Sequence, residues 1–203
     1  MTELDPSSAF NQLHNSLQGY SPISPTTWQA LQKACTLKRV DKGTHLYSLG
    51  ETPHHFAYIV TGLFRVFISD EQGNEYNKNF FEQGQFPGSM AALLTNTPSK
   101  FSVEALEDSV VITIDFKTFR QQLTQHHDLA LFHIHYLEQN WLLTKEPREV
   151  ALVQNEARQR YVQFLKDHPS LAERIPQFHI ASHLGITPTQ LSRIRKSLHD
   201  QSL

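Results

Sequence analysis

The segment 177–198, QFHIASHLGITPTQLSRIRKSL, limits the possible folds of this chain more than any other stretch of its sequence. Two helices that cross steeply need a small residue where they touch and a turn residue that tolerates positive φ. Ala181 and Gly185 meet these two needs. Apolar residues recur with helical spacing on both sides of the turn, namely Ile180, Leu184, Ile186, Leu191, Ile194 and Leu198. The segment is therefore predicted to form a helix-turn-helix.

The start of the second helix is marked by several residues that follow the turn. Thr187 is a favourable N-cap, Pro188 suits the first helical position, and Gln190 completes a capping box with Thr187. Ile186 and Leu191 have the spacing of a hydrophobic staple. We therefore expect this helix to begin at Pro188.

Polar and basic residues fill the face of the second helix that the apolar residues leave free. They are Thr187, Thr189, Gln190, Ser192, Arg193, Arg195 and Lys196. Such a face suits the major groove of DNA, because Arg can bind guanine bidentately, Gln can read adenine, and hydroxyl or ammonium groups can hold phosphates. We expect Arg193 to read a base. The alternative is an ordinary pair of helices with a solvated basic face.

Charge is distributed unevenly along the 203 residues. Lys and Arg number 10 against 15 Asp and Glu in residues 1–147, which gives −5, and 8 against 5 in residues 148–203, which gives +3. A polyanion-binding surface is therefore expected in the C-terminal part alone. The sequence has neither a run of ~20 apolar residues nor the start typical of a signal peptide, so we expect a cytoplasmic location and no membrane partner.

The pattern of many short strands extends over residues 36–115. Its β-branched and aromatic runs, separated by glycine turns, are TLKRV, THLYSL, FAYIV, FRVFIS, YNKNFF, FSVEAL and VVITI. Two short helices are expected over residues 6–34, the second beginning at Pro25, and helical patterns follow Asp115. The predicted fold class is α+β, with an N-terminal jelly-roll or β-roll, a long helix, and a C-terminal, winged-helix-like domain that contains the helix-turn-helix.

The stretch 129–143, LALFHIHYLEQNWLL, is apolar on two sides of a helix. One stripe comprises Ile134, Leu137 and Trp141, and another comprises Phe132, Tyr136 and Leu143. Such a helix needs two packing partners. We expect one partner to be the barrel and the other to be the same helix of a second subunit, with the first stripe at the interface of a homodimer. A single helix buried between two domains of a monomer is the alternative.

Three domains are predicted along the chain. Residues 1–126 form the N-terminal helices and the β-roll, residues 127–150 form the dimerisation and linker helix, and residues 151–203 form the DNA-binding domain. Pro147 is expected to break or kink the linker helix, and a connecting helix is expected over residues 156–166.

The order of these parts resembles that of the CRP/FNR family of bacterial transcription regulators over nearly the whole chain. The roll carries the resemblance at residues 42–43, 50–51, 58–62, 65–66, 70–75 and 81–86, and the helix-turn-helix carries it in LGITPTQLSRIRK. The resemblance implies a homodimer whose sensor barrel orients two recognition helices on a near-palindromic double-stranded DNA operator, with RNA polymerase as a further partner. Pro188 and Thr189 replace the Arg-Glu pair of the best-known members, whereas Arg193 matches their later arginine.

The ligand cassette departs from the family pattern. Members that bind cyclic AMP have Gly-Glu-(Leu/Ala), then Arg-Ser or Arg-Thr about ten residues later. The resemblance places the ligand site at Gly88, Ser89, Met90, Ser99 and Lys100, with Ser89 in place of the glutamate and Ser99 in place of the arginine. Each lost charged hydrogen bond would contribute about 1.5–3 kcal/mol. We therefore expect no cyclic AMP cofactor, and either a different, unidentified small-molecule effector or none.

Metal and haem chemistry find little support in the sequence. Cys35 is the single cysteine, which excludes an internal disulfide and the iron–sulfur branch of the family. Candidate haem ligands lack diagnostic spacing, and they are His54, His55, His126, His127, His133 and His135. His133 and His135 lie two apart and should point to different helix faces. We expect no metal site.

The function expected from these observations is that of a homodimeric, sequence-specific DNA-binding transcription regulator. It is not expected to be an enzyme, because the sequence has no nucleophile elbow, P-loop or His-Glu-x-x-His motif. The alternatives are a cyclic-nucleotide-responsive regulator, a nucleotide-binding module that works through protein contacts, and a cupin-like enzyme. The last would need a His/Glu cluster in the barrel strands, where the runs offer little histidine besides His45.

Overall fold

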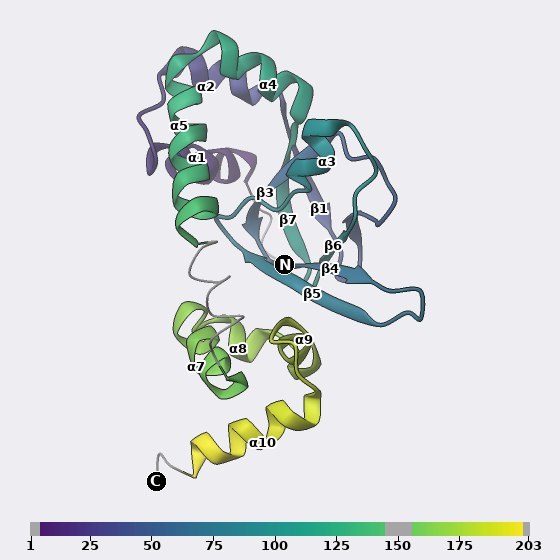
Figure 1. The fold of residues 1–203 in the computed structure, drawn as a ribbon. Helices are drawn as coiled ribbons and strands as arrows, with labels where there is room; N and C mark the ends of the chain where they lie inside the picture. The colour runs from purple at the N-terminus through teal and green to yellow at the C-terminus, as the bar shows by residue number, and fades with distance from the viewer. Residues whose placement is uncertain (1–4, 145–155, 201–203) are drawn as a thin grey trace. The chain divides into compact units, whose positions relative to one another are not determined.

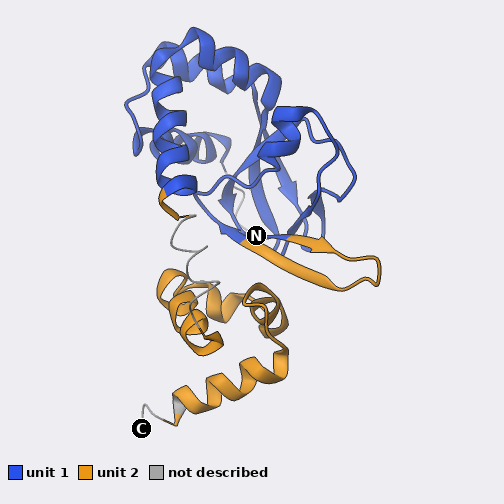
Figure 2. Cartoon of the chain, viewed as in Figure 1, with its two compact units in different colours: residues 1–66, 80–142 blue, residues 67–79, 143–203 orange. Residues whose placement is uncertain are grey.

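The structure is a computed structural model that describes residues 5–144 and 156–200 (Figure 1). The chain forms two compact units (Figure 2). The first comprises Met1–Val66 and Phe80–Leu142, and the second comprises Phe67–Asn79 and Leu143–Leu203. The second unit thus combines a short hairpin segment with the C-terminal helices.

Two capped helices begin the first unit, as predicted. Helix α1 (Pro6–Gln18) is capped by the Asp5 carboxylate, which accepts from the Ser7 N–H, and α2 (Pro25–Gln32) is capped by the Ser24 hydroxyl. Both helices have proline at the first position, where its missing N–H is not needed. The buried residues of α1 recur every four positions and are Ala9, Leu13 and Leu17. This spacing turns one stripe of α1 toward the core.

Seven strands form within residues 35–115, all of which are described. They are β1 (Cys35–Val40), β2 (His45–Tyr47), β3 (His55–Thr61), β4 (Leu63–Ser69), β5 (Glu75–Glu82), β6 (Ser102–Ala105) and β7 (Ser109–Asp115). They make a three-stranded sheet of order β1-β7-β3 and a four-stranded sheet of order β2-β6-β4-β5. Strand β7 pairs antiparallel with both β1 and β3. Each predicted run overlaps one strand, which confirms the roll.

Apolar side chains on the two faces of the three-stranded sheet enter separate cores. One core joins both sheets through Val40, Tyr47, Ala57, Ile59, Phe64, Val66, Val103, Ala105 and Val111. The other joins the sheet to the helices, through residues that include Tyr58, Ile112, Leu13, Phe119 and Phe132. Because both faces are covered, β3 is buried at five consecutive positions instead of alternate ones.

Glycine permits two of the turns in the roll. Gly62 joins β3 to β4 with φ of 118°, and a Cβ there would collide with the Ser109 side chain. Gly73 has φ of 83° in the turn between β4 and β5, where the Asp70 N–H donates to the Asn74 carbonyl at 3.0 Å. The predicted hairpin over residues 70–74 is thereby confirmed.

Helices follow the roll, and one lies within it. The sequence did not predict α3 (Met90–Thr95), whereas α4 (Phe116–Gln125) and α5 (His127–Leu137) confirm the helical pattern after Asp115. A π-helix, η1 (Glu138–Leu142), continues from α5. Pro147 lies outside the described residues, so its expected effect on the linker helix stays a prediction.

The second unit is helical apart from its hairpin segment, within the described residues. Its helices are α7 (Ala157–Asp167), α8 (Leu171–Arg174), α9 (Gln177–His183) and α10 (Pro188–His199). Helix α7 confirms the predicted connecting helix and is capped by a box between Glu156 and Gln159. No strand forms over residues 156–200, where the sequence has no alternating β-branched run, so a wing is not found there. None of the helices in the described ranges is long and apolar enough to cross a membrane.

Candidate functional site

The helix-turn-helix has the geometry that its sequence predicts. Gly185 adopts φ of 67° between α9 and α10, and Ala181 is fully buried. The Ile186 N–H donates to the Ala181 carbonyl at 3.0 Å, which closes the turn. Leu191 is buried on the inner side of α10. The two helices therefore pack through the predicted apolar positions.

A reciprocal capping box fixes the start of α10. The Thr187 hydroxyl accepts from the Gln190 N–H at 3.2 Å, and Gln190 Oε1 accepts from the Thr187 N–H at 2.9 Å. Both predicted cap residues are confirmed, and Pro188 holds the first helical position. Because Gln190 Oε1 already accepts a hydrogen bond, adenine reading by Gln190 would compete with the cap.

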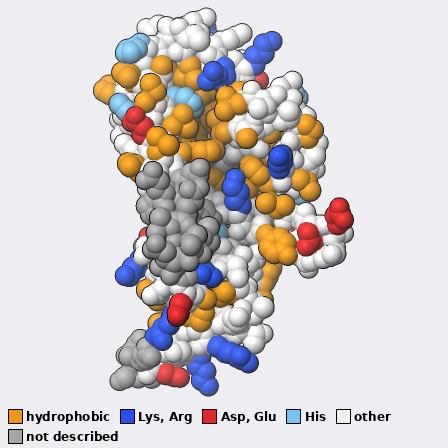
Figure 3. All heavy atoms as spheres, viewed as in Figure 1, with side chains coloured by type: hydrophobic (Ala, Val, Ile, Leu, Met, Phe, Trp, Pro, Cys, Tyr) orange, Lys and Arg blue, Asp and Glu red, His pale blue; other side chains and the backbone are white. Residues whose placement is uncertain are grey.

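The predicted DNA-contacting residues all lie on the exposed side of α10. They are Thr187, Thr189, Gln190, Ser192, Arg193, Arg195 and Lys196. Figure 3 shows Lys and Arg side chains gathered over the end of the molecule where α10 lies. Thr189, Arg193 and Lys196 are spaced four and three residues apart and so follow one line along the helix. This line can enter a groove while the buried side of α10 holds the helix pair together.

Arg160 on α7 supports the turn, and sequence patterns did not single it out. Its Nε and Nη2 atoms donate to the Leu184 carbonyl, at 3.3 and 3.1 Å. Leu184 is the C-cap of α9, where backbone carbonyls lack helical partners. The contact joins residues 24 apart, which local periodicity cannot show.

The two serines at the family's ligand positions bind each other. Ser89 Oγ and Ser99 Oγ are 3.2 Å apart, and the Ser99 hydroxyl donates to the Phe101 carbonyl at 2.7 Å. Only 1% of Ser89 and 2% of Ser99 is exposed. The backbone of Ser99 is held as well, because its N–H donates to the Glu51 carbonyl and its carbonyl accepts from the Gly50 N–H. The pair forms a closed polar contact at the cassette.

The other predicted ligand residues do not join the two serines. Met90 faces an apolar crevice shared with Phe56 and Phe86, and Lys100 is exposed. Gly88 packs so closely on β3 that an added Cβ would lie 2.8 Å from the Phe56 Cβ. Of the five predicted residues, Ser89 and Ser99 are joined by a side-chain hydrogen bond.

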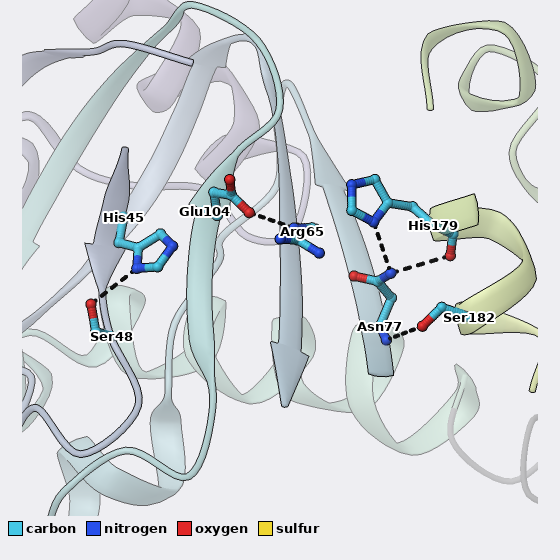
Figure 4. Close-up of polar contacts among 7 residues, drawn as sticks. All are labelled: His45, Ser48, Arg65, Asn77, Glu104, His179 and Ser182. Carbon is cyan, nitrogen blue, oxygen red and sulfur yellow. Dashed lines mark hydrogen bonds and ion pairs between the residues drawn. The ribbon is translucent and has the colours of Figure 1, made fainter. Parts of the chain in front are cut away.

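An ion pair that the sequence did not predict lies in the four-stranded sheet. Arg65 on β4 binds Glu104 on the neighbouring β6 (Figure 4). Arg65 is buried, so its charge requires this partner. His45 on β2 binds the Ser48 hydroxyl, and among residues 5–144 and 156–200 it belongs to no group of three His, Cys, Asp or Glu side chains that could hold a metal.

The long apolar helix packs one face against its own roll and exposes part of another. Phe132 is buried against Phe86, as predicted for the barrel-facing stripe. Ile134 is 48% exposed, and Trp141 is 47% exposed although it lines the small crevice beside Leu137. Leu142 and Leu143 are 62% and 70% exposed. Placing Leu143 in the barrel-facing stripe was wrong, because the π-helix changes the register after Leu137.

Three of the candidate haem histidines, His126, His133 and His135, are used in packing or hydrogen bonds. His133 rests on the Phe119 ring, with centroids 5.4 Å apart, and burial lowers its pKa. His135 Nδ1 lies 3.0 Å from the Tyr20 carbonyl, so the two histidines point to different faces, as predicted. His126 Nδ1 lies 3.1 Å from the Thr27 hydroxyl. Within the described ranges, no three His, Cys, Asp or Glu side chains form a metal-binding group.

A β-roll with helices on one sheet, a long apolar helix and a helix-turn-helix follow one another along the chain. Residues 37–126 match the cyclic nucleotide-binding domain family. Over 191 residues the chain is 25% identical to the cAMP-activated global transcriptional regulator CRP of Salmonella typhimurium, covering 90% of this chain and 91% of that protein. Over nearly its whole length, the chain is therefore similar to the CRP/FNR family of transcription regulators.

Solved structures of similar fold include two further proteins. The c-di-GMP-responsive global regulator CLP of Xanthomonas campestris matches with a TM-score of 0.71 and 16% identity, over 89% of this chain and 94% of that chain. FixK2 of Bradyrhizobium japonicum matches with a TM-score of 0.69 and 19% identity, over 83% and 86%. These likenesses confirm the α+β fold, and the homologous proteins are regulators and not enzymes.

Proposed function

We propose that this chain is a sequence-specific DNA-binding regulator that acts as a homodimer on a near-palindromic operator. The observation that carries the proposal is the exposed polar face of α10, on a helix whose start is fixed by a capping box and whose opposite side is buried. A helix that reads DNA must have a defined register and a face free to enter the groove. The regulator would act in the cytoplasm with RNA polymerase as a further partner.

Each exposed residue of α10 has a role that suits its chemistry. Arg193 reads a guanine through its planar pair of donors, and Thr189 contacts the adjacent base edge or phosphate. Ser192, Arg195 and Lys196 hold the DNA backbone. Thr187 and Gln190 act mainly through the cap, which presents their neighbours at the correct angle.

The exposed apolar residues on and after α5 support dimerisation. Ile134 and Trp141 of the predicted interface, which also includes Leu137, are 48% and 47% exposed in a single chain, and Leu142 beside them is 62% exposed. Large apolar side chains exposed in this way favour an interaction site. A second copy of the same helix would cover it and supply the second recognition helix.

The sensor roll is proposed not to respond to cyclic AMP through the family cassette. Ser89 and Ser99 supply neither a carboxylate for the ribose nor a guanidinium for the phosphate, and each is buried against the other. Effectors differ among the similar proteins, since CRP is cAMP-activated and CLP is c-di-GMP-responsive. The effector of this chain is therefore proposed to be chemically different from cyclic AMP, or absent.

Selection of DNA fragments by the full chain, followed by gel-shift titration, tests the DNA-binding proposal. We expect Arg193→Ala to reduce the preference for the selected site over random DNA by about 1–3 kcal/mol of binding free energy, the effect of losing one bidentate base contact. Lys166→Ala removes the same charge from an exposed position on α7 and should leave that ratio unchanged. Equal affinity of the unaltered chain for all fragments would refute sequence-specific binding.

Calorimetric titration with cyclic AMP tests the sensor proposal separately. No saturable heat is expected at micromolar nucleotide. Saturable binding that Ser99→Ala abolishes would show that the cassette accepts the nucleotide after all.

A further inference from the structure

The hairpin between β4 and β5 contacts α9 of the helix-turn-helix. Hairpin residues 67–79 and the C-terminal helices belong to the same compact unit, although β4 and β5 are also neighbouring strands of the four-stranded sheet, with β5 at its edge. Figure 4 shows Asn77 on β5 with His179 and Ser182 of α9 directed toward it. The contact therefore joins hairpin residues of β5 to the first helix of the helix-turn-helix, within one compact unit.

Four groups of α9 bind the hairpin. The Asn77 N–H donates to Ser182 Oγ at 2.9 Å, and the Ser182 hydroxyl donates to the Glu75 carbonyl at 2.9 Å. Asn77 Nδ2 lies 3.1 Å from His179 Nδ1 and 3.3 Å from the His179 carbonyl. His183 Nδ1 lies 3.3 Å from the Asn77 carbonyl. The backbone and the side chain of Asn77 are thus both used.

Burial makes this contact sensitive to geometry. Asn77 is 5% exposed and His179 is 6% exposed. Leaving a buried amide without its hydrogen-bond partners costs about 1–3 kcal/mol of folding free energy. The contact therefore favours the one position of β5 against α9 in which these hydrogen bonds form. The His179 carbonyl can only accept, which fixes the Asn77 side chain with its N–H₂ group toward α9.

The contact leaves the DNA-reading face of α10 open. Arg193 and Lys196 are exposed while α9 is held by the hairpin. We propose that Asn77 is a positioning residue for DNA binding, which sets the angle of the helix-turn-helix by holding His179 and Ser182 on β5. This inference rests on the proposed DNA-binding function and adds to it a role for the contact between the hairpin and α9.

The test compares Asn77→Asp and Ser182→Ala with Asn79→Ala in the full chain. Asn77→Asp keeps the side-chain shape but removes both donors, and Ser182→Ala removes the hydroxyl that bridges Asn77 and Glu75. Asn79 lies two residues along the same strand, is half-buried, and serves as the matched control. The readouts are amide hydrogen exchange at residue 77 and operator affinity for the selected site and for the same site with two base pairs inserted between its halves.

We expect Ser182→Ala to speed exchange at residue 77, and both contact variants to lower operator affinity about tenfold, the loss expected for one or two buried hydrogen bonds. Both variants should also discriminate less between the two operator spacings, because a less firmly held helix pair tolerates a changed distance between the two half-sites. Asn79→Ala should behave as the unaltered chain. Unchanged affinity and spacing preference in both contact variants would overturn the proposal, as would faster exchange without any change in DNA binding.

The two proposals fail in distinguishable ways. If the unaltered chain binds no operator, the DNA-binding function fails, and the exchange rates still decide whether the contact forms. If Asn77→Asp does not fold, Ser182→Ala decides the outcome, since Ser182 is only partly buried.

Discussion

Asp128 fastens the start of α5 to the start of α2. Its carboxylate accepts from the Ser24 N–H and the Thr27 hydroxyl, each at 2.8 Å, and from the Leu129 N–H at 3.0 Å. Burial opposes ionisation of this carboxyl, but the hydrogen bonds from Ser24 and Thr27 outweigh it and lower the pKa of Asp128 to about 2. The ionised carboxylate therefore stabilises the folded sensor.

This shift predicts an acid-dependent loss of stability. Because the folded pKa lies below the ordinary value near 3.8, the contribution of Asp128 is fully present above about pH 4 and is lost as the pH falls toward 2. With allowance for solvent screening, Asp128→Asn should lower the free energy of unfolding by about 1–2 kcal/mol at pH 7 and flatten its decline between pH 4 and 2. Urea unfolding measures both, with exposed Asp41→Asn as the control. Identical curves for Asp128→Asn and the unaltered chain would contradict this role.

Local chemistry decides which residues could be predicted from the sequence. Thr187 and Gln190 lie three apart, so their capping box is visible in a short window. Arg160 binds Leu184, and Asn77 binds His179 across 102 residues of chain. Such contacts depend on how distant segments fold together, so periodicity and spacing could not find them.

At the scale of elements, α10 depends on its cap. The Thr187 hydroxyl satisfies the Gln190 N–H, one of the backbone donors that a helix start leaves unpaired. Ser192 lies on the exposed side of the same helix. Substitutions at Thr187 and Ser192 can therefore distinguish the effect of losing the cap from that of losing a surface hydroxyl.

We predict that Thr187→Ala lowers stability by about 1 kcal/mol, the usual effect of removing a threonine N-cap. The matched Ser192→Ala should change stability by less than about 0.5 kcal/mol. Thermal unfolding of the two variants measures the difference in stability, and hydrogen exchange of the amides of α10 shows whether the helix start is affected. Equal effects of the two substitutions would show that the box does not hold the helix start.

Elements with a strong local pattern were predictable, and elements that need packing to form were not. The strand runs and α1, α2, α7, α9 and α10 were each predicted from alternation, helical spacing or caps. Helix α3 spans only Met90–Thr95 and has no side-chain cap. The π-helix at Glu138–Leu142 could not be distinguished from a continuing α-helix by the spacing of apolar residues.

At the scale of the whole molecule, the exposed face of α5 predicts the oligomeric state. Ile134 is about half exposed, so a polar residue there should not disturb the fold of one subunit. Ile134→Asp is expected to produce monomers, because a carboxylate would be buried without a partner at the interface. Sedimentation equilibrium measures the change, with Leu94→Asp on α3 as the control, at an apolar residue that is also exposed. An Ile134→Asp dimer as tight as the unaltered one would contradict this interface, and an unaltered chain that is monomeric would contradict dimerisation itself.

The organisation of the whole chain was predictable only in its order of parts. Roll, apolar helix and helix-turn-helix follow one another as the sequence indicates, because each has its own periodicity. The grouping of residues 67–79 with the C-terminal helices could not be predicted, because the sequence pattern of the hairpin is like that of the other strands and turns of the roll.

Hydroxyl-radical footprinting of the full chain on its selected operator tests the central claim most directly. Two copies of α10 in successive major grooves should protect two segments related by a two-fold axis, with centres about 10 base pairs apart. Arg193→Ala should reduce both protections together. A single protected segment, or uniform protection without a two-fold pattern, would contradict the account.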